Sequence, residues 1–352
     1  MPVSSAELIA DPIGRYPHAT VACFDPTCGG LPRRSLDEPR TIAFLERLAR
    51  LGAEGVLIAS STGQGHLRTV AELEAWFHCA ARADLAETVP MALLRPEDGE
   101  RSNLRLMDRL AESGYPALFL RPGTDLPADA GDEAVSDSLA PLLAAAAERG
   151  FAVGLYSISD VSGLPLTPGA AARLVVAPGG GHLVAVKVTE VDYDTTTARF
   201  LAHPALTRLK IVQGWDPHLG RALRDGPRFD TEGRQRAGIT SGLMSLALFQ
   251  YQHLLAAGRR GDWQELEQAQ RAATDLFRAM QDDPHHFADL QRAKYIMGLG
   301  HPLTGEVTPE QVGRVFAALE GLPRPADRQR LARSLDLMGD GPYHDRLLAL
   351  SS

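Results

Sequence analysis

The chain has 352 residues, 44% hydrophobic and 23% charged, which is typical of a globular protein with one large domain or two average ones. Its net charge of −8 argues against nucleic acid or an anionic membrane as the main partner. The cysteines lack metal-site spacing, and no apolar run reaches the roughly 18 residues of a membrane span. We therefore expect a cytoplasmic protein without a signal peptide or a disulfide framework.

Short apolar runs alternate with stretches of helical periodicity over most of the chain. We expect strands at residues 19–24, 54–59, 89–94, 117–121, 151–156, 183–187, 210–213 and 239–241. Helices are expected at residues 41–52, 69–86, 99–113, 133–149, 168–176, 195–202, 217–224 and 243–257. Eight strand–helix units predict an α/β fold, a (β/α)8 TIM barrel over residues 15–258. A doubly wound open sheet is the alternative, but no glycine-rich phosphate-binding motif follows the first strand.

After residue 258 the pattern is helical only. Amphipathic periodicity predicts helices at residues 263–281, 287–297 and 309–320, and one more around 328–337. We expect residues 259–352 to form a C-terminal helical region packed on the barrel. Residues 282–286 contain two aspartates and two histidines, but such a run before a helix is more typical of a solvated helix cap than of a metal site. No metal is expected there.

The sixth expected strand ends in a lysine, Lys187, after four apolar residues at 183–186. Lysine is among the residues least often buried, so a lysine at the end of a core strand needs a reason. One interpretation is a side chain that extends to the surface. The other is a desolvated, neutral amine that attacks a carbonyl group and forms a Schiff base. This stretch alone favours the side chain that extends to the surface.

Other polar residues also follow the expected strands, and in TIM barrels the active site lies at the carboxyl ends of the strands. Tyr156 and Lys187 end adjacent strands, so their side chains can converge, and a tyrosine hydroxyl beside an amine can relay protons. The hydroxyl and N–H groups of Ser61, Thr62 and Gly63, after strand two, can hold a carboxylate without a basic side chain. Each feature alone is typical of an ordinary turn or a packed aromatic residue. Their combination indicates a site.

Three segments carry a resemblance to a known family. Residues 55–64 read GVLIASSTGQ, residues 155–163 read LYSISDVSG and residues 184–187 read VAVK. In the same order, the dihydrodipicolinate synthase and N-acetylneuraminate lyase superfamily has an apolar strand followed by Gly-Thr-Thr-Gly-Glu, the motif Leu-Tyr-Asn-Val-Pro-x-Arg-Thr-Gly, and an apolar strand ending in the Schiff-base lysine. Over roughly residues 15–320 the chain resembles a divergent member of this superfamily of class I aldolases.

The resemblance implies a role for each matching residue. Lys187 would form the imine with a 2-oxo acid such as pyruvate, and Tyr156 would relay protons to and from the substrate. The Ser61 and Thr62 amides would bind the substrate carboxylate, with the Ser61 hydroxyl joining the relay. Lys187, Tyr156 and Ser61 are thus the expected catalytic residues. Because the protonated imine itself serves as the electron sink, no cofactor is expected.

The sequence departs from the family pattern around the second substrate. Val161 replaces the arginine that holds a carboxylate in dihydrodipicolinate synthases, and valine cannot form that ion pair. Thr124 stands where the family has an aromatic residue that completes the relay across a subunit contact, and Ser157 changes the polarity beside the substrate. Arg121 is a candidate replacement for the missing arginine. The expected substrate-binding residues are Thr62, Gly63, Arg121, Thr124 and Ser157.

The sequence therefore predicts a Schiff-base lyase for a pyruvate-type 2-oxo acid. The expected reaction is retro-aldol cleavage of a 2-keto-3-deoxy or 4-hydroxy-2-oxo acid. A dehydratase that uses the same lysine imine is one alternative, and a non-catalytic homologue that binds a 2-oxo acid is another. The resemblance also implies a homo-oligomer, either a dimer or a tetramer, with no nucleic acid or membrane partner.

Overall fold

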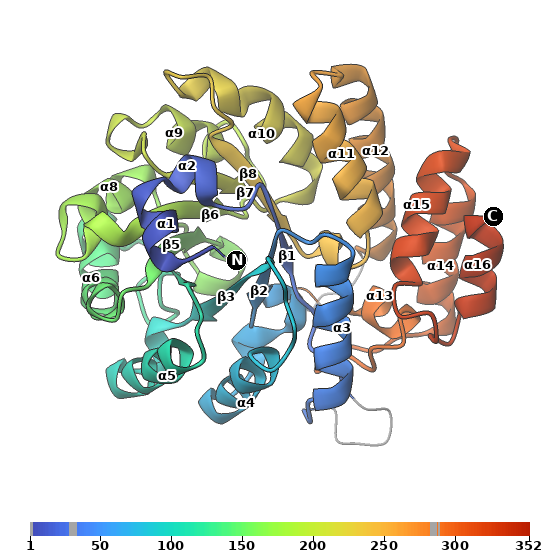
Figure 1. Cartoon of the computed structure of the whole chain (residues 1–352), viewed down its shortest axis with the longest axis horizontal. Helices are drawn as coiled ribbons and strands as arrows, with labels where there is room; N and C mark the ends of the chain where they lie inside the picture. Colours follow the sequence, from blue (N-terminus) through green and yellow to red (C-terminus); the bar gives the residue numbers. More distant parts are fainter. Residues whose placement is uncertain (1–2, 28–33, 282–286, 288) are drawn as a thin grey trace.

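Eight parallel strands close into a barrel in the computed structural model, which describes residues 3–27, 34–281, 287 and 289–352. Each strand pairs with the next along the chain, and the last pairs with the first (Figure 1). The TIM-barrel prediction is confirmed, and the doubly wound alternative is wrong. The acidic and histidine run at 282–286, interpreted above as a helix cap, lies outside the described residues, as does Cys28. The strands are β1 (Ala19–Ala22), β2 (Gly55–Ile58), β3 (Val89–Leu94), β4 (Ala117–Leu120), β5 (Ala152–Ser157), β6 (Leu183–Val188), β7 (Lys210–Gln213) and β8 (Ala237–Ser241).

The strands are buried on both faces, which is why they read as apolar runs rather than as alternating patterns. Every strand residue is buried except Pro90, which is partly exposed. Their observed bounds differ from the predicted ones by two residues at most. This agreement follows from the strong contrast between apolar strand and polar turn in a parallel barrel.

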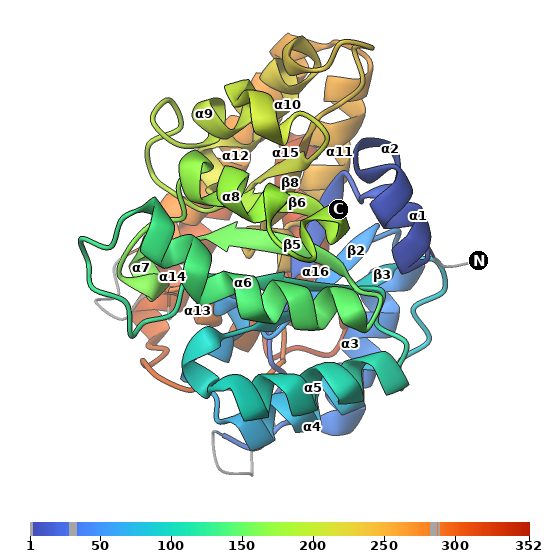
Figure 2. The same cartoon turned by 90° about the vertical axis from the view of Figure 1, so that its left-hand side faces the viewer.

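Helices surround the barrel on all sides (Figures 1 and 2). Helix α4 begins at a capping box in which Thr69 and Glu72 bond each other's backbone N–H, as predicted, but it ends at Ala80 rather than at residue 86. Two short N-terminal helices and α7 were not predicted. The helices of this part are α1 (Ser5–Ala10), α2 (Pro12–Arg15), α3 (Glu38–Arg50), α4 (Val70–Ala80), α5 (Glu100–Glu112), α6 (Asp132–Glu148), α7 (Ser159–Ser162), α8 (Pro168–Val176), α9 (Thr197–Ala202), α10 (Leu219–Asp225) and α11 (Leu248–Arg259).

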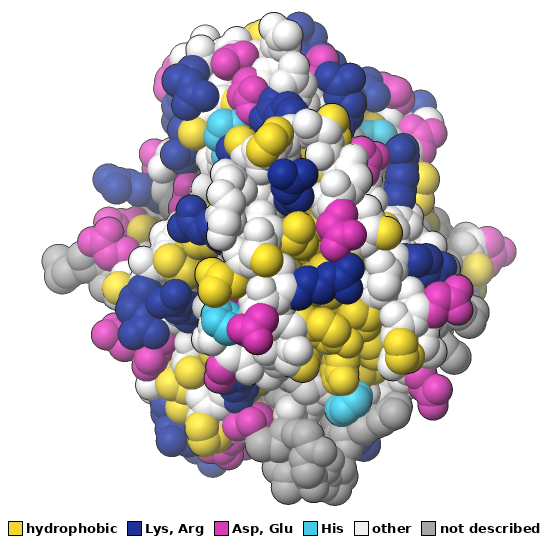
Figure 3. Space-filling model, turned by 90° about the vertical axis from the view of Figure 1, so that its right-hand side faces the viewer, with side chains coloured by type: hydrophobic (Ala, Val, Ile, Leu, Met, Phe, Trp, Pro, Cys, Tyr) yellow, Lys and Arg dark blue, Asp and Glu magenta, His cyan; other side chains and the backbone are white. Residues whose placement is uncertain are grey.

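The remaining helices form the expected C-terminal helical region beside the barrel. In Figure 1, α14, α15 and α16 stack on one side of the molecule, and α12 packs against α11 and α14. Seen from that side, the surface mixes hydrophobic and charged side chains (Figure 3), and Leu348 of α16 is exposed. The division into domains at residue 258 stays a prediction. These helices are α12 (Trp263–Met280), α13 (Gln291–Ile296), α14 (Pro309–Glu320), α15 (Pro325–Leu335) and α16 (His344–Ser351). Throughout the described ranges, no helix combines the length and apolar character that crossing a membrane requires.

A buried group of three charges ties the C-terminal region to the barrel. Asp25, just after β1, accepts hydrogen bonds from Lys294 of α13 at 2.8 Å and from Arg68, just before α4, at 2.6 Å. All three side chains are at most 1% exposed. One carboxylate therefore compensates two cations in the interior. Removing it would leave Lys294 without its described counter-ion and Arg68 with only Glu72, at 3.9 Å.

We predict that Asp25→Asn lowers the free energy of unfolding by about 3–5 kcal/mol, because it leaves the buried Lys294 without its described counter-ion and Arg68 with only the more distant Glu72. Urea denaturation followed by circular dichroism measures this loss. The control is Asp340→Asn, which breaks an ion pair with Arg40 in which the Asp340 side chain is 58% exposed. That exposed pair contributes at most about 1 kcal/mol. Equal losses in the two variants would contradict the role given to Asp25.

Candidate active site

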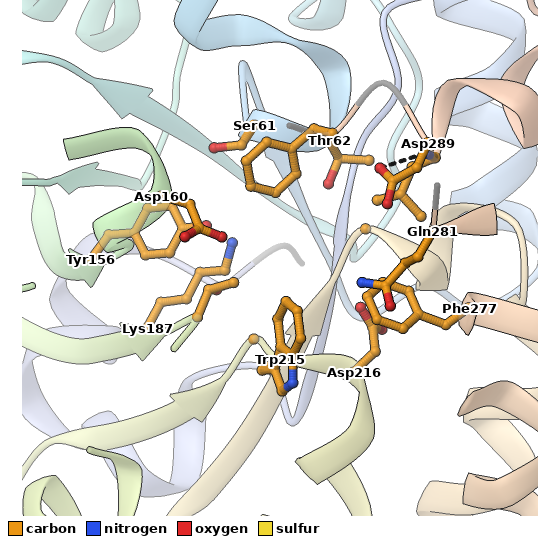
Figure 4. A pocket seen from close by; sticks show the side chains of 15 residues that line it. Ser61, Thr62, Tyr156, Asp160, Lys187, Trp215, Asp216, Phe277, Gln281 and Asp289 are labelled. Atoms are coloured by element: carbon orange, nitrogen blue, oxygen red, sulfur yellow. Dashed lines mark hydrogen bonds between the residues drawn. The ribbon is translucent and has the colours of Figure 1, made fainter. Parts of the chain in front are cut away.

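A pocket of about 360 Å³ opens at the carboxyl ends of the barrel strands (Figure 4). It lies where the strand-end rule for TIM barrels predicts an active site. Residues that follow five strands meet here with residues of the C-terminal region. The described lining consists of Ser61, Thr62, Tyr156, Asp160, Lys187, Thr189, Gly214, Trp215, Asp216, Gly242, Phe277, Gln281, Phe287, Asp289 and Leu290.

Lys187 and Tyr156 meet in this pocket. They are directly paired in the β5–β6 register, and the Lys187 Nζ lies 3.9 Å from the centre of the Tyr156 ring. Lys187 is 4% exposed, so its side chain does not extend to the surface. Burial lowers the pKa of Lys187 to about 7, although the Asp216 carboxylate acts in the opposite direction. A large share of this amine is therefore neutral and nucleophilic near neutral pH.

Tyr156 is held protonated beside that amine. Its side chain is almost fully buried, and burial raises the pKa of Tyr156 while the nearby hydroxyls of Thr189 and Ser61 oppose the rise. A neutral phenol can donate a proton to an oxygen that develops negative charge in the pocket. Tyr156 thus has the position and the protonation state of a general acid.

The turn after β2 presents two backbone N–H groups to the pocket. The segment Ser61–Gly63 forms one turn of 3₁₀ helix in which the next N–H groups, those of Gly63 and Gln64, bond back to Ser60 and Ser61. Within the described ranges, no acceptor bonds the N–H groups of Ser61 and Thr62, the first two of the turn. Both residues line the pocket. Two such N–H groups side by side suit a carboxylate.

Residues from the C-terminal region hold this turn in place. The Gln291 Nε2 donates to the Thr62 carbonyl oxygen. Gln64 is buried in a left-handed conformation at φ 51°, and its Oε1 accepts from the Leu303 N–H at 2.6 Å while its Nε2 donates to the Thr304 Oγ1 at 2.8 Å. The C-terminal region therefore fixes the geometry of the turn as well as covering the barrel.

Four of the expected substrate-binding residues lie outside the described lining. A Cβ atom at Gly63 would lie 2.7 Å from the Cys23 carbonyl oxygen, so Gly63 packs against β1 instead. The Ser157 Oγ donates to Glu190 at 2.6 Å. Arg121 is buried in an ion pair with Glu97, and Thr124 is exposed. Gly63, Ser157 and Arg121 would have to leave these surroundings to touch a molecule in the pocket.

Eleven of the fifteen described lining residues were not among the expected site residues. Thr189, Trp215, Asp216 and Gly242 follow strands, so the strand-end rule could have selected them. Asp160 lies in the short helix after β5. No local signal marks the C-terminal contributors, because their place depends on how that region folds back over the barrel. These are Phe277, Gln281, Phe287, Asp289 and Leu290.

Asp216, which was not among the expected site residues, is buried and held by hydrogen bonds. It is 5% exposed, and its Oδ1 accepts hydrogen bonds from the Ser241 hydroxyl and, at 3.1 Å, from the Tyr251 hydroxyl. Burial raises the pKa of Asp216 to about 7, while these two hydroxyls and the Lys187 charge oppose the rise. In Figure 4, Asp216 and Lys187 face each other across the pocket. An acid and an amine with similar pKa values thus lie at its two ends.

Fold and site together define a class of protein: a TIM barrel with a desolvated, pocket-lining lysine at the end of its sixth strand. No family model matches the chain. A 4-hydroxy-tetrahydrodipicolinate synthase of Xylella fastidiosa is 27% identical over 259 residues, covering 73% of this chain and 76% of the relative. This relative is named as a synthase of the same superfamily that the three sequence segments described above resemble. The chain is therefore similar to a member of the dihydrodipicolinate synthase and N-acetylneuraminate lyase superfamily, which the three segments also resemble.

Solved structures of this superfamily share the fold. A prophage protein of the dihydrodipicolinic acid synthase family from E. coli K12, in complex with pyruvate, superposes with a TM-score of 0.73 at 15% identity, over 87% of this chain and 98% of that one. A Sulfolobus solfataricus 2-keto-3-deoxygluconate aldolase variant gives 0.70 at 14% identity, over 87% and 96%. The Ruminococcus gnavus sialic acid aldolase gives 0.71 at 15%, over 91% and 98%.

The pKa of Lys187 predicts how its reactivity changes with pH. An amine is nucleophilic only when neutral, so labelling of Lys187 by acetic anhydride should rise with pH and level off above about pH 7. In Asp216→Asn the midpoint should move to lower pH, because the carboxylate that favours the charged amine is gone. Mass spectrometry of the Lys187 peptide measures both curves. A midpoint near the ordinary lysine value of 10.5 would show that the amine is not desolvated.

Proposed function

We propose that the chain is a Schiff-base-forming lyase of the aldolase type that acts on a pyruvate-type 2-oxo acid. The observation that carries this proposal is the desolvated Lys187 amine, which shares one pocket with the Tyr156 hydroxyl and the Ser61 and Thr62 N–H groups. The relatives named above are aldolases and a synthase, which supports an enzyme of aldolase type.

Imine formation follows from these groups. The Ser61 and Thr62 N–H groups bind the carboxylate of the 2-oxo acid, and this places its carbonyl carbon at the Lys187 amine. The neutral amine adds to that carbon, and the oxygen takes up a proton to give a carbinolamine. Tyr156 then donates a proton to the carbinolamine hydroxyl, which leaves as water while the C=N bond forms. Lys187 now carries a protonated imine.

Cleavage uses the imine as an electron sink. When the Tyr156 phenolate takes up the proton of the C4 hydroxyl, the electrons of the C3–C4 bond move into the imine, which becomes an enamine, and C4 becomes an aldehyde carbon. Protonation of C3 and hydrolysis of the imine release pyruvate and the free lysine. The proposed substrate is accordingly a 2-keto-3-deoxy or 4-hydroxy-2-oxo acid. Loss of water through the same imine would instead make the chain a dehydratase.

Reductive trapping tests the imine. We expect borohydride with pyruvate to attach a reduced pyruvate to Lys187, detected by peptide mass spectrometry, and Lys187→Arg to abolish the adduct. The other lysines of the chain, Lys210 and Lys294, serve as internal controls because both are buried but neither lines the pocket. No adduct in the folded protein, or an adduct on Lys210 instead, would contradict the proposal.

Tyr156→Phe should slow imine formation by about 10²–10³-fold, because the phenol supplies the proton that the leaving hydroxyl needs. The rate of borohydride trapping at limiting pyruvate measures this change. The buried Tyr115, whose hydroxyl bonds the Phe77 carbonyl oxygen away from the pocket, provides the matched control Tyr115→Phe. Equal trapping rates in wild type and Tyr156→Phe would remove the proton-relay role from Tyr156.

Product analysis then separates the reactions that share the imine. Released pyruvate with an aldehyde indicates cleavage, a dehydrated 2-oxo acid indicates a dehydratase, and trapping without turnover indicates a non-catalytic binder. The cytoplasmic location and the dimeric or tetrameric assembly stay predictions. Light scattering on the purified chain measures the assembly directly.

A further inference from the structure

Glu190 is a buried carboxylate beside the site that has no role in the mechanism proposed above. It lies two residues after the end of β6 and three residues after Lys187, and it is 7% exposed. It does not belong to the described lining of the pocket. A carboxylate is seldom buried unless it is paired or hydrogen-bonded, because its ionised form loses hydration in the interior. The partners of Glu190 therefore indicate what this side chain holds.

All described hydrogen-bond partners of the Glu190 carboxylate belong to the segment that follows Tyr156. The Glu190 Oε1 accepts from the Ser157 hydroxyl at 2.6 Å and from the Ser159 N–H at 3.0 Å, and its Oε2 accepts from the Ser159 hydroxyl at 2.6 Å. Hydrogen bonds to a charged acceptor are stronger than neutral ones, so these three offset much of the cost of burial. Glu190 thus ties the end of β6, which carries Lys187, to the end of β5, which carries Tyr156.

The same network shapes the segment after β5. The Ser157 Oγ, which donates to Glu190, also accepts from the Leu166 N–H at 3.1 Å. The Ser159 N–H is the first of α7, and the first N–H groups of a helix have no partner within the helix. Glu190 supplies that partner. It therefore holds the short helix that places Asp160 in the lining of the pocket.

Tyr156 depends on both the position and the charge of Glu190. The Ser157 hydroxyl, which Glu190 holds, belongs to the residue directly after Tyr156, so this bond fixes the strand end that carries the phenol. Burial is the main cause of the raised pKa of Tyr156, and the Glu190 charge adds to it. The Lys187 Nζ lies 3.9 Å from the centre of the Tyr156 ring. A small displacement of the ring would therefore change the geometry between phenol and amine.

We propose that Glu190 is a positioning residue, which holds the end of β5 so that the Tyr156 hydroxyl is aligned for proton transfer at the Lys187 imine. This role rests on the proposed imine chemistry, whereas the hydrogen-bonded network itself does not. Because Glu190 lies outside the described lining, it acts through Tyr156. The carboxylate of the 2-oxo acid is bound elsewhere, by the N–H groups of Ser61 and Thr62.

The kinetics of borohydride trapping test this role. We expect Glu190→Ala to lower the maximal rate of pyruvate trapping about 10–100-fold, because the phenol loses its alignment. The pyruvate concentration at half-maximal rate should change by less than about twofold, since the pyruvate carboxylate is bound at the turn after β2. Glu190→Gln keeps the shape of the side chain and one acceptor oxygen, and it should recover most of the rate. A Glu190→Gln protein as slow as Glu190→Ala would contradict a role in positioning.

A matched control changes a carboxylate at the opposite end of the barrel. Glu54 directly precedes β2 and accepts a hydrogen bond from the His18 N–H at 2.7 Å. It lies outside the described lining of the pocket. Glu54→Gln should therefore trap pyruvate at the wild-type rate.

A second comparison tests whether Glu190 acts through Tyr156. In a Tyr156→Phe background, Glu190→Ala should slow trapping by less than about twofold, because the hydroxyl that it positions is already gone. A residue that only stabilises the fold would slow both backgrounds equally. Ser159→Ala, which removes one of the three hydrogen bonds, should slow the wild-type background about threefold and the Tyr156→Phe background not at all. This milder variant keeps the test decisive if Glu190→Ala does not fold.

Amide hydrogen exchange tests the network without the imine. The peptide that contains residues 157–166 should exchange about tenfold faster in Glu190→Ala than in wild type, since the Ser159 N–H loses its acceptor. Mass spectrometry of the full chain after digestion measures this change. Glu54→Gln should leave the exchange of this peptide as it is in wild type.

The outcomes separate the two proposals. If wild type, Glu190→Ala and Ser159→Ala trap pyruvate at equal rates, the positioning role is wrong and the lyase function stands. Equal slowing with and without the Tyr156 hydroxyl also overturns the positioning role. If the wild-type protein traps no pyruvate, the lyase function is wrong, and the exchange of residues 157–166 then decides whether Glu190 holds the end of β5.

Discussion

The desolvation of one amine is the constraint on which the site depends. A charged ammonium on a buried side chain loses most of its hydration, so the neutral form is favoured, and only the neutral form attacks a carbonyl. The barrel supplies the walls of that environment through β5 and β6, and the C-terminal region closes it with Phe277 and Leu290. The C-terminal helices are thus part of the chemistry, because an open barrel end would rehydrate the amine.

Burial alone does not make a lysine reactive, and the other lysines of this chain show why. Lys294 is buried against Asp25, a fixed carboxylate. Lys210, at the opposite end of the barrel, shares a pKa lowered to about 7, yet its Nζ bonds the Ile13 and Gln235 carbonyl oxygens and lies 3.1 Å from a His18 ring nitrogen. No described hydrogen-bond acceptor holds the Lys187 Nζ, which lines a pocket. Among the lysines of this chain, only Lys187 combines a lowered pKa, an amine without a described hydrogen-bond acceptor, and a position in the lining of a pocket.

The sequence predicts those parts of the site that depend on local pattern and on the order of the strands. Tyr156 and Lys187 end consecutive apolar runs, and in a barrel built from consecutive strands such residues become neighbours. Contacts between side chains that are far apart along the chain could not be predicted from local pattern. Glu190 engages Ser157 from 33 residues away, and Glu97 engages Arg121 from 24, so two residues expected at the substrate are held elsewhere. The strand-end rule selects the position of Asp216, but its environment depends on the packing of α11.

Asp216 and Lys187 also influence each other through the reaction itself. With a pKa of about 7, the free Lys187 amine is only partly charged near neutral pH, so its stabilisation of an ionised Asp216 is partial. In the proposed mechanism the imine nitrogen is protonated, and a positive charge at that end would favour the ionised form of Asp216. The carboxylate in turn stabilises the imine that it faces. The proposed imine at one end of the pocket would therefore promote negative charge on Asp216 at the other.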